Sequence, residues 1–88
     1  MTIKKGYTLT HIGREHIILP VGEETVHFDG LIHINDIGCF LFEKLSSDMT
    51  LDALLEDVLA EYEIDEKTAR KDVKDFLDQL LKQGIIDA

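Results

Sequence analysis

Hydrophobic and polar residues alternate near the start of the chain, whereas in its second half apolar residues recur every three or four positions. Alternation is typical of a half-buried strand, and the longer period is typical of an amphipathic helix. The pattern therefore predicts an α+β fold in which a small N-terminal antiparallel sheet precedes a three-helix bundle. A short turn between the last two helices makes the arrangement winged-helix-like, with its strands placed first. We expect residues 1–88 to form one domain.

The strands are delimited by glycine and proline. The first alternating segment, Tyr7–Ile12, lies between two glycines, and a β-branched run at 16–19 ends at Pro20. Further on, Asp29-Gly30 favours a two-residue type I′ turn, because both central residues of that turn need a positive φ. It is expected to join strands at 25–28 and 31–34, with Ile32 and Ile34 directed toward the core.

Three helices are predicted to follow, each with a polar residue at its N-cap. The first covers about 36–45, the second begins after Thr50 and the third begins after Asp65. Gly84 provides a C-terminal stop for the third helix. The apolar stripe of that helix is predicted to contain Ala69, Val73, Phe76, Leu77, Leu80 and Leu81.

Charge and composition restrict the class of protein. The chain has a formal net charge of −9, of which −2 falls in residues 1–45 and −7 in residues 46–88. Binding to nucleic acid depends on neutralising phosphates, so this balance argues against a nucleic-acid partner and suits a peptide or protein, particularly a basic one. No segment has the apolar length of a membrane span and the first six residues lack a signal-peptide core, so a cytoplasmic protein is expected.

The sequence offers little support for catalysis or metal binding. Two pairs of histidines, His11 with His16 and His27 with His33, have no spacing typical of a metal site, and the single thiol belongs to a different element. Cys39 is therefore expected to be a small buried hydrophobic residue. Neither a phosphate-binding glycine loop nor a catalytic triad is apparent, so no cofactor, metal or enzymatic activity is predicted.

Five segments, in order and with suitable spacing, resemble the successive signatures of the PqqD family. The similarity covers nearly the whole chain, from about Tyr7 to Ile86, although Phe42 stands where many relatives have tryptophan and Ile34 where leucine is usual. The segments are Gly30–Asn35, Gly38–Phe42, Thr50–Leu54, Asp72–Leu77 and Gly84–Ile86.

The resemblance implies a RiPP recognition element, a non-catalytic chaperone for ribosomally made peptides that are later modified. Such a domain binds the leader of a precursor peptide and presents it to a modifying enzyme, often a radical SAM protein. In the namesake pathway the precursor becomes pyrroloquinoline quinone, and related members serve other peptide pathways.

The expected mechanism is β-augmentation, in which an extended peptide pairs with an open strand edge and adjacent pockets bind alternate side chains. The segment 31–34 contains no proline that would remove a donor, and the third helix would form the opposite wall. Proline at Ile32 or His33 is expected to abolish binding, and Arg70, Lys71 and Lys74 are expected to attract acidic leader residues. The predicted peptide-binding residues are Leu31, Ile32, His33, Ile34, Arg70, Val73, Lys74 and Leu77.

Two other classes of function stay open. The last two helices could form a DNA-binding helix-turn-helix, although the candidate recognition helix at 65–82 carries five acidic and five basic residues and has no net charge. Alternatively, the domain could be a protein–protein adaptor that docks an enzyme and ignores free peptide.

Overall fold

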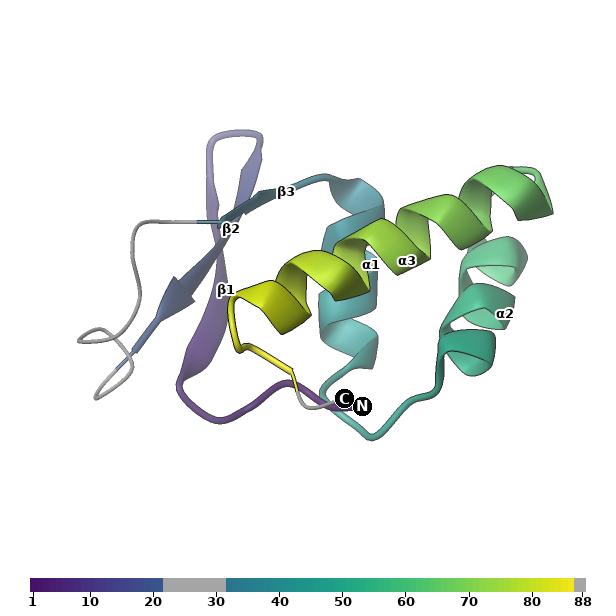
Figure 1. Ribbon diagram of the computed structural model, residues 1–88. Coiled ribbons are helices and arrows are strands. Elements are labelled where there is room, and N and C mark those ends of the chain that lie inside the picture. Colours follow the sequence, from purple (N-terminus) through teal and green to yellow (C-terminus); the bar gives the residue numbers. More distant parts are fainter. Residues whose placement is uncertain (22–31, 87–88) are drawn as a thin grey trace.

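The computed structural model describes residues 1–21 and 32–86, and in this part of the chain a three-stranded sheet is followed by three helices. The sheet lies at one end of the molecule and α2 at the other, with α1 between them and α3 running alongside from the sheet to α2 (Figure 1). This confirms the predicted α+β arrangement. The elements are β1 (Tyr7–Ile12), β2 (Glu15–Pro20), β3 (Ile32–Ile34), α1 (Asp36–Lys44), α2 (Leu51–Glu61) and α3 (Glu66–Lys82). The predicted Asp29-Gly30 turn and the strand at 25–28 lie outside the described residues.

The β1–β2 hairpin is closed by a two-residue turn whose first residue, Gly13, has a φ of 62°. With no other residue of this turn at positive φ, the geometry is that of a type II′ turn, and the flanking Ile12 and Glu15 form a hydrogen-bonded pair. At the other end of the hairpin, the Val21 N–H donates to the Gly6 carbonyl at 2.7 Å. Hydrogen-bonded and non-bonded residue pairs alternate along an antiparallel ladder. Counting from either end of the hairpin therefore assigns the same residue pairs to the hydrogen-bonded set, and we call this assignment the phase of the hairpin.

All three helices begin at the predicted caps. The Asn35 side chain accepts a hydrogen bond from the Gly38 N–H at 2.8 Å, and Thr50 accepts one from the Ala53 N–H at 3.1 Å. Asp65 accepts from the Thr68 N–H at 3.1 Å and from its hydroxyl, and these bonds hold the pKa of Asp65 below its usual range. Each cap satisfies an N–H group that has no partner inside its own helix. No helix in residues 1–21 and 32–86 has both the length and the apolar character to cross a bilayer.

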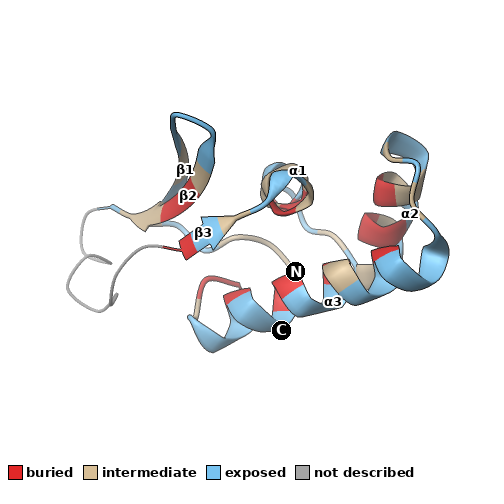
Figure 2. Cartoon of the chain, turned by 90° about the horizontal axis from the view of Figure 1, so that it is seen from above, coloured by how far each residue is buried: buried red, intermediate tan, exposed pale blue. Residues whose placement is uncertain are grey.

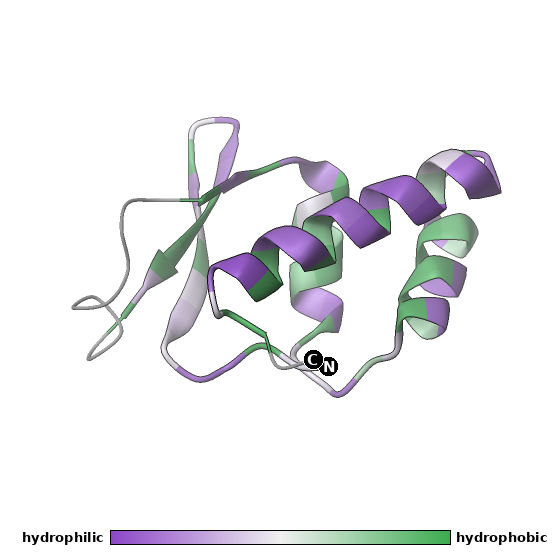
Figure 3. Ribbon diagram, viewed as in Figure 1, coloured by the Kyte–Doolittle hydropathy of each residue, from purple (hydrophilic) through white to green (hydrophobic). Residues whose placement is uncertain are grey.

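The core lies between the sheet and the helices, as the inward-facing buried turns in Figure 2 illustrate. Five of the six stripe residues predicted for α3 are buried, and the exposed face of α3 is strongly polar (Figure 3). Leu81 is the exception at 39% exposure, because it lies at the margin of the stripe. Beyond the predicted stop at Gly84, whose φ is 72°, Ile85 and Ile86 fold back into the core.

Candidate functional site

A groove of about 270 Å³ lies where β3, the start of α1 and the middle of α3 meet. The strand and the first turn of α1 form one side, and α3 forms the other. Phe76 of α3 is largely buried and belongs to the core, so it gives the groove an apolar base. The lining residues are His33, Ile34, Asn35, Ile37, Gly38, Asp72, Asp75, Phe76 and Gln79.

The outer edge of β3 offers backbone hydrogen-bonding groups beside this groove. In β2 the phase of the hairpin directs the backbone groups of His16 and Ile18 toward β3, where their Cα partners are Ile34 and Ile32. His33, between those two residues, must then direct its N–H and C=O away from β2. Within the described residues β3 ends the sheet, whose order is β1-β2-β3.

The side chain of His33 points away from the groove. Alternation places it on the face of the sheet opposite Ile32 and Ile34, where its Nδ1 lies 3.4 Å from Glu15 Oε2. His33 is 61% exposed in its side chain. Its contribution to the groove is therefore its main chain.

Gly38 allows the three elements around the groove to approach closely. A Cβ atom at this position would lie 3.0 Å from the Ile34 Cβ and 3.2 Å from the Phe76 Cε1. The Ile34 Cβ is attached directly to the strand backbone, so it cannot move aside as the end of a long side chain would. Glycine thus permits α1 to start against both β3 and α3.

The groove faces one flank of the α3 stripe, whereas the predicted basic residues lie on the other flank. At about 100° per residue, Asp72, Asp75 and Gln79 lie to one side of the stripe, whereas Arg70 and Lys74 lie to the opposite side. Both basic residues are exposed, and Arg70 Nη2 lies 3.8 Å from Glu66 Oε1. The pattern of apolar residues defines the stripe but not the side on which the strand packs.

The other predicted site residues fall into three groups. Ile34 and the backbone of His33 border the groove, whereas Leu31 lies outside the described residues. Ile32 is buried in the core next to β2. Val73 and Leu77, at 0% and 5% exposure, pack into the core and do not line the groove.

The charge of the groove is consequently acidic, contrary to the basic wall that was expected. Asp75 is paired with Lys71, whose Nζ donates to Oδ2 at 2.6 Å, and this bond raises the pKa of Lys71. Asp72 has no ion pair within the described residues. A basic or neutral side chain is thus favoured at this wall over an acidic one.

A second group of side chains comes together between the β1–β2 hairpin and α1, outside the groove. His11, His16 and Cys39 lie close to one another, although the sequence analysis gave the histidines no metal-site spacing and placed the thiol apart from them. Cys39 is also half-buried instead of fully buried. Burial raises the pKa of its thiol, and the carboxylates of Glu43 and Asp36 raise it further, so the group is not an activated nucleophile at neutral pH.

The model of the family described as "Coenzyme PQQ synthesis protein D (PqqD)" matches residues 15–86, which is most of the chain. The chain belongs to the PqqD family. This confirms the resemblance found in the sequence, and the matched range includes every residue that lines the groove. No curated protein sequence matches the chain closely.

Two solved structures share the fold of this PqqD-family chain. One is described as TbiB1 in complex with the TbiA(beta) leader peptide, with a TM-score of 0.74 and 20% identity, covering 100% of this chain and 96% of that chain. The other is a lasso peptide synthetase B1 complexed with the leader peptide, with a TM-score of 0.69 and 14% identity, covering 94% and 92% respectively. At these identities the similarity establishes the common fold.

Proposed function

We propose that this chain is a peptide chaperone that binds the leader of a ribosomally made precursor peptide as an added strand beside β3. Family membership and the leader peptides named for both structural neighbours support this function. The observation that carries the mechanism is the combination of an outward-facing His33 backbone with an adjoining groove. Within residues 1–21 and 32–86 no strand or helix pairs with this edge of β3, and an open strand edge is either a hazard or a binding surface.

In this mechanism the peptide backbone pairs with His33, and alternate peptide side chains enter the groove. An apolar side chain would contact Phe76 at the base. A basic side chain would lie against Asp72, which has no ion pair among the described residues. The acidic wall therefore selects a leader with an apolar residue and a nearby lysine or arginine.

We infer that the chain presents the bound leader to a separate modifying enzyme, of the radical SAM class, and catalyses no reaction itself. The raised pKa of the Cys39 thiol, the family membership and the leader peptides named for both structural neighbours support a non-catalytic role. Co-purification of the chain with such an enzyme, strengthened by the precursor peptide, tests the partnership. If the modified product forms at the same rate without this chain, a role in presentation is excluded.

The function is tested with fluorescein-labelled leader segments synthesised from short reading frames that adjoin the gene. Fluorescence anisotropy should give saturable binding of one leader and no saturation with a scrambled peptide of equal composition. A random-sequence DNA duplex at low salt serves as the rival ligand, and the acidic groove predicts no binding to it. Binding of the duplex with no response to any leader would favour the helix-turn-helix function instead.

A further inference from the structure

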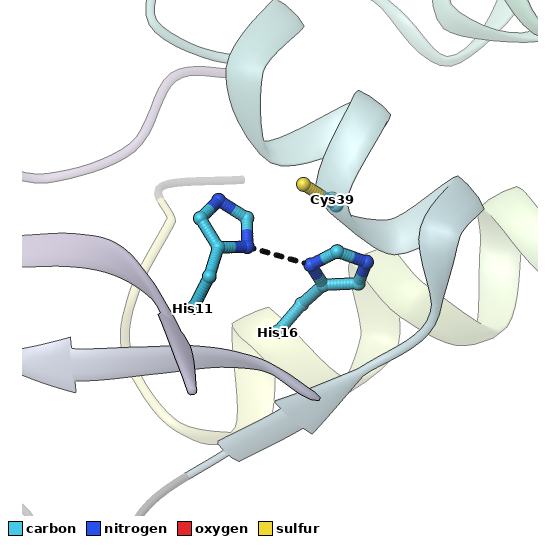
Figure 4. Close-up of side chains that lie close together, drawn as sticks. All are labelled: His11, His16 and Cys39. Atoms are coloured by element: carbon cyan, nitrogen blue, oxygen red, sulfur yellow. Dashed lines mark hydrogen bonds between the residues drawn. The ribbon is translucent and has the colours of Figure 1, made fainter. Parts of the chain in front are cut away.

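Two imidazoles and a thiol converge between the β1–β2 hairpin and α1, outside the groove (Figure 4). His11 and His16 are Cα partners in the hairpin, so their side chains project from the same face of the sheet. Cys39 comes from the first turns of α1, which packs over that face. One ligand atom from each residue lies within 4.8 Å of the other two. Among the described residues, these three side chains form a group that could hold a metal ion.

The hydrogen bonds around His16 set its tautomer. Its Nε2 lies 2.7 Å from Asp36 Oδ1, and a carboxylate can only accept, so Nε2 carries the hydrogen. In the neutral ring Nδ1 then presents a lone pair toward His11, whose Nδ1 lies 2.8 Å away. A carboxylate that orients a histidine in this way is the usual outer partner of a metal-binding imidazole.

We propose that His11, His16 and Cys39 bind a single divalent ion of the zinc type, with the fourth position open to water. Two imidazole nitrogens and one thiolate are a ligand set that suits a borderline-soft ion, and His11 lies at the surface where an ion can enter. Asp36 acts as a positioning residue through His16. The groove and its peptide play no part in this site.

The observed geometry requires small movements to accept the ion. Metal–nitrogen bonds of about 2.0–2.1 Å and a metal–sulfur bond of about 2.3 Å place tetrahedral ligand atoms roughly 3.3–3.6 Å apart. The two Nδ1 atoms, now joined by a shared hydrogen, would separate by roughly half an ångström when the ion replaces that hydrogen. The thiol would move toward them by up to about 1.2 Å through a change in its side-chain torsion, because no pair of ligand atoms is more than 4.8 Å apart.

The ion would connect elements that are distant in the sequence. His11 and His16 belong to the hairpin and Cys39 to α1, so binding would fix the sheet against the first helix. Since the unfolded chain does not hold these three groups together, the ion should raise the thermal unfolding midpoint.

Cobalt(II) titration of the reduced full-length protein tests the site directly. We expect a thiolate-to-cobalt charge-transfer band and visible d–d bands that saturate at one equivalent and disappear on addition of zinc(II). Cys39→Ser should abolish the charge-transfer band. His11→Asn and His16→Asn should each weaken cobalt binding and reduce the d–d intensity, with folding checked by circular dichroism.

A matched pair of variants isolates the role of Asp36. Asp36→Asn should weaken cobalt binding by about 10-fold, in line with the loss of an outer-shell partner, whereas Asp52→Asn, which removes a first-turn carboxylate from α2, should have no effect. The proposal is overturned if the unsubstituted protein gives no charge-transfer band. It is equally overturned if that band is unchanged when both histidines are replaced, because cobalt would then be bound by the thiol without them.

Discussion

The two outer strands of the described sheet each border a hollow beside a helix, but they present different groups to it. At β3 the hollow is the groove described above: α3 forms its opposite wall, and the main chain of His33 borders it. At β1 a hollow of about 500 Å³ is bordered by α1 and receives the imidazole of His11, together with Glu43. Both residues are exposed histidines on outer strands, and their opposite side-chain directions follow from strand alternation.

The difference explains why similar places in the fold suit different ligands. A backbone donor and acceptor next to an apolar base suit an extended peptide, which supplies the complementary groups at every second residue. Imidazole nitrogens beside a thiol suit a metal ion. The phase of each strand, and not its residue composition, determines which chemistry faces the hollow.

The largest effect is expected from His33→Pro, which removes the outward N–H without breaking a bond to β2. The peptide carbonyl would lose its partner and the ring would obstruct the edge, so affinity should fall by about 10- to 100-fold. Anisotropy titration measures the change. His33→Ala is the matched control: it keeps the N–H, and its side chain lies outside the groove, so it should remain within about threefold of the parent.

Proline at Ile32, for which the sequence alone predicts the same loss of binding, is expected to act differently from proline at His33. Its backbone groups point toward β2, so Ile32→Pro should destabilise the sheet itself. Equal losses of peptide binding from His33→Pro and His33→Ala would contradict the proposed backbone pairing.

Gly38→Ala should destabilise the fold and narrow the groove. Helix propensity favours alanine by about 1 kcal/mol, but overpacking against Ile34 and Phe76 costs about 1–3 kcal/mol, so the net loss should be about 1 kcal/mol. Urea unfolding measures the sign. A gain in stability would mean that β3, α1 and α3 are less closely packed at the groove than described.

Asp72→Lys should weaken binding of a leader that contains a basic residue. Replacing attraction by repulsion at the groove wall should lower affinity by about fivefold at low salt and by less at high salt. Glu56→Lys on α2 makes the same change in net charge away from the groove and serves as the control. If both variants weaken binding equally, the effect arises from total charge and not from the acidic wall.

Arg70→Glu tests the flank of α3 that the sequence favoured. Because Arg70 is exposed and does not border the groove, the substitution should change affinity by less than about twofold. Titrations at two salt concentrations provide the comparison with Asp72→Lys. A larger effect for Arg70→Glu than for Asp72→Lys would restore the basic flank as the peptide-binding wall.

The starts of the helices could be predicted from the sequence, because a helix N-cap depends on local hydrogen bonds. Asn35, Thr50 and Asp65 cap their helices as predicted. The site was harder to predict. An apolar stripe indicates which face of α3 is buried, but the flank next to β3 depends on how the helix crosses the sheet. In the same way, the spacing of residues in the sequence could not predict that Cys39 lies next to His11 and His16, because the hairpin register and the position of α1 together determine that contact.

Amide hydrogen exchange with and without saturating leader peptide tests the central claim most directly. The account predicts that the His33 amide, directed outward from β3, exchanges at least several-fold more slowly in the complex. The Leu9 amide, which the same alternation directs outward from β1, should exchange at an unchanged rate. Protection of Leu9 with no change at His33 would place the peptide on the wrong edge and contradict the account.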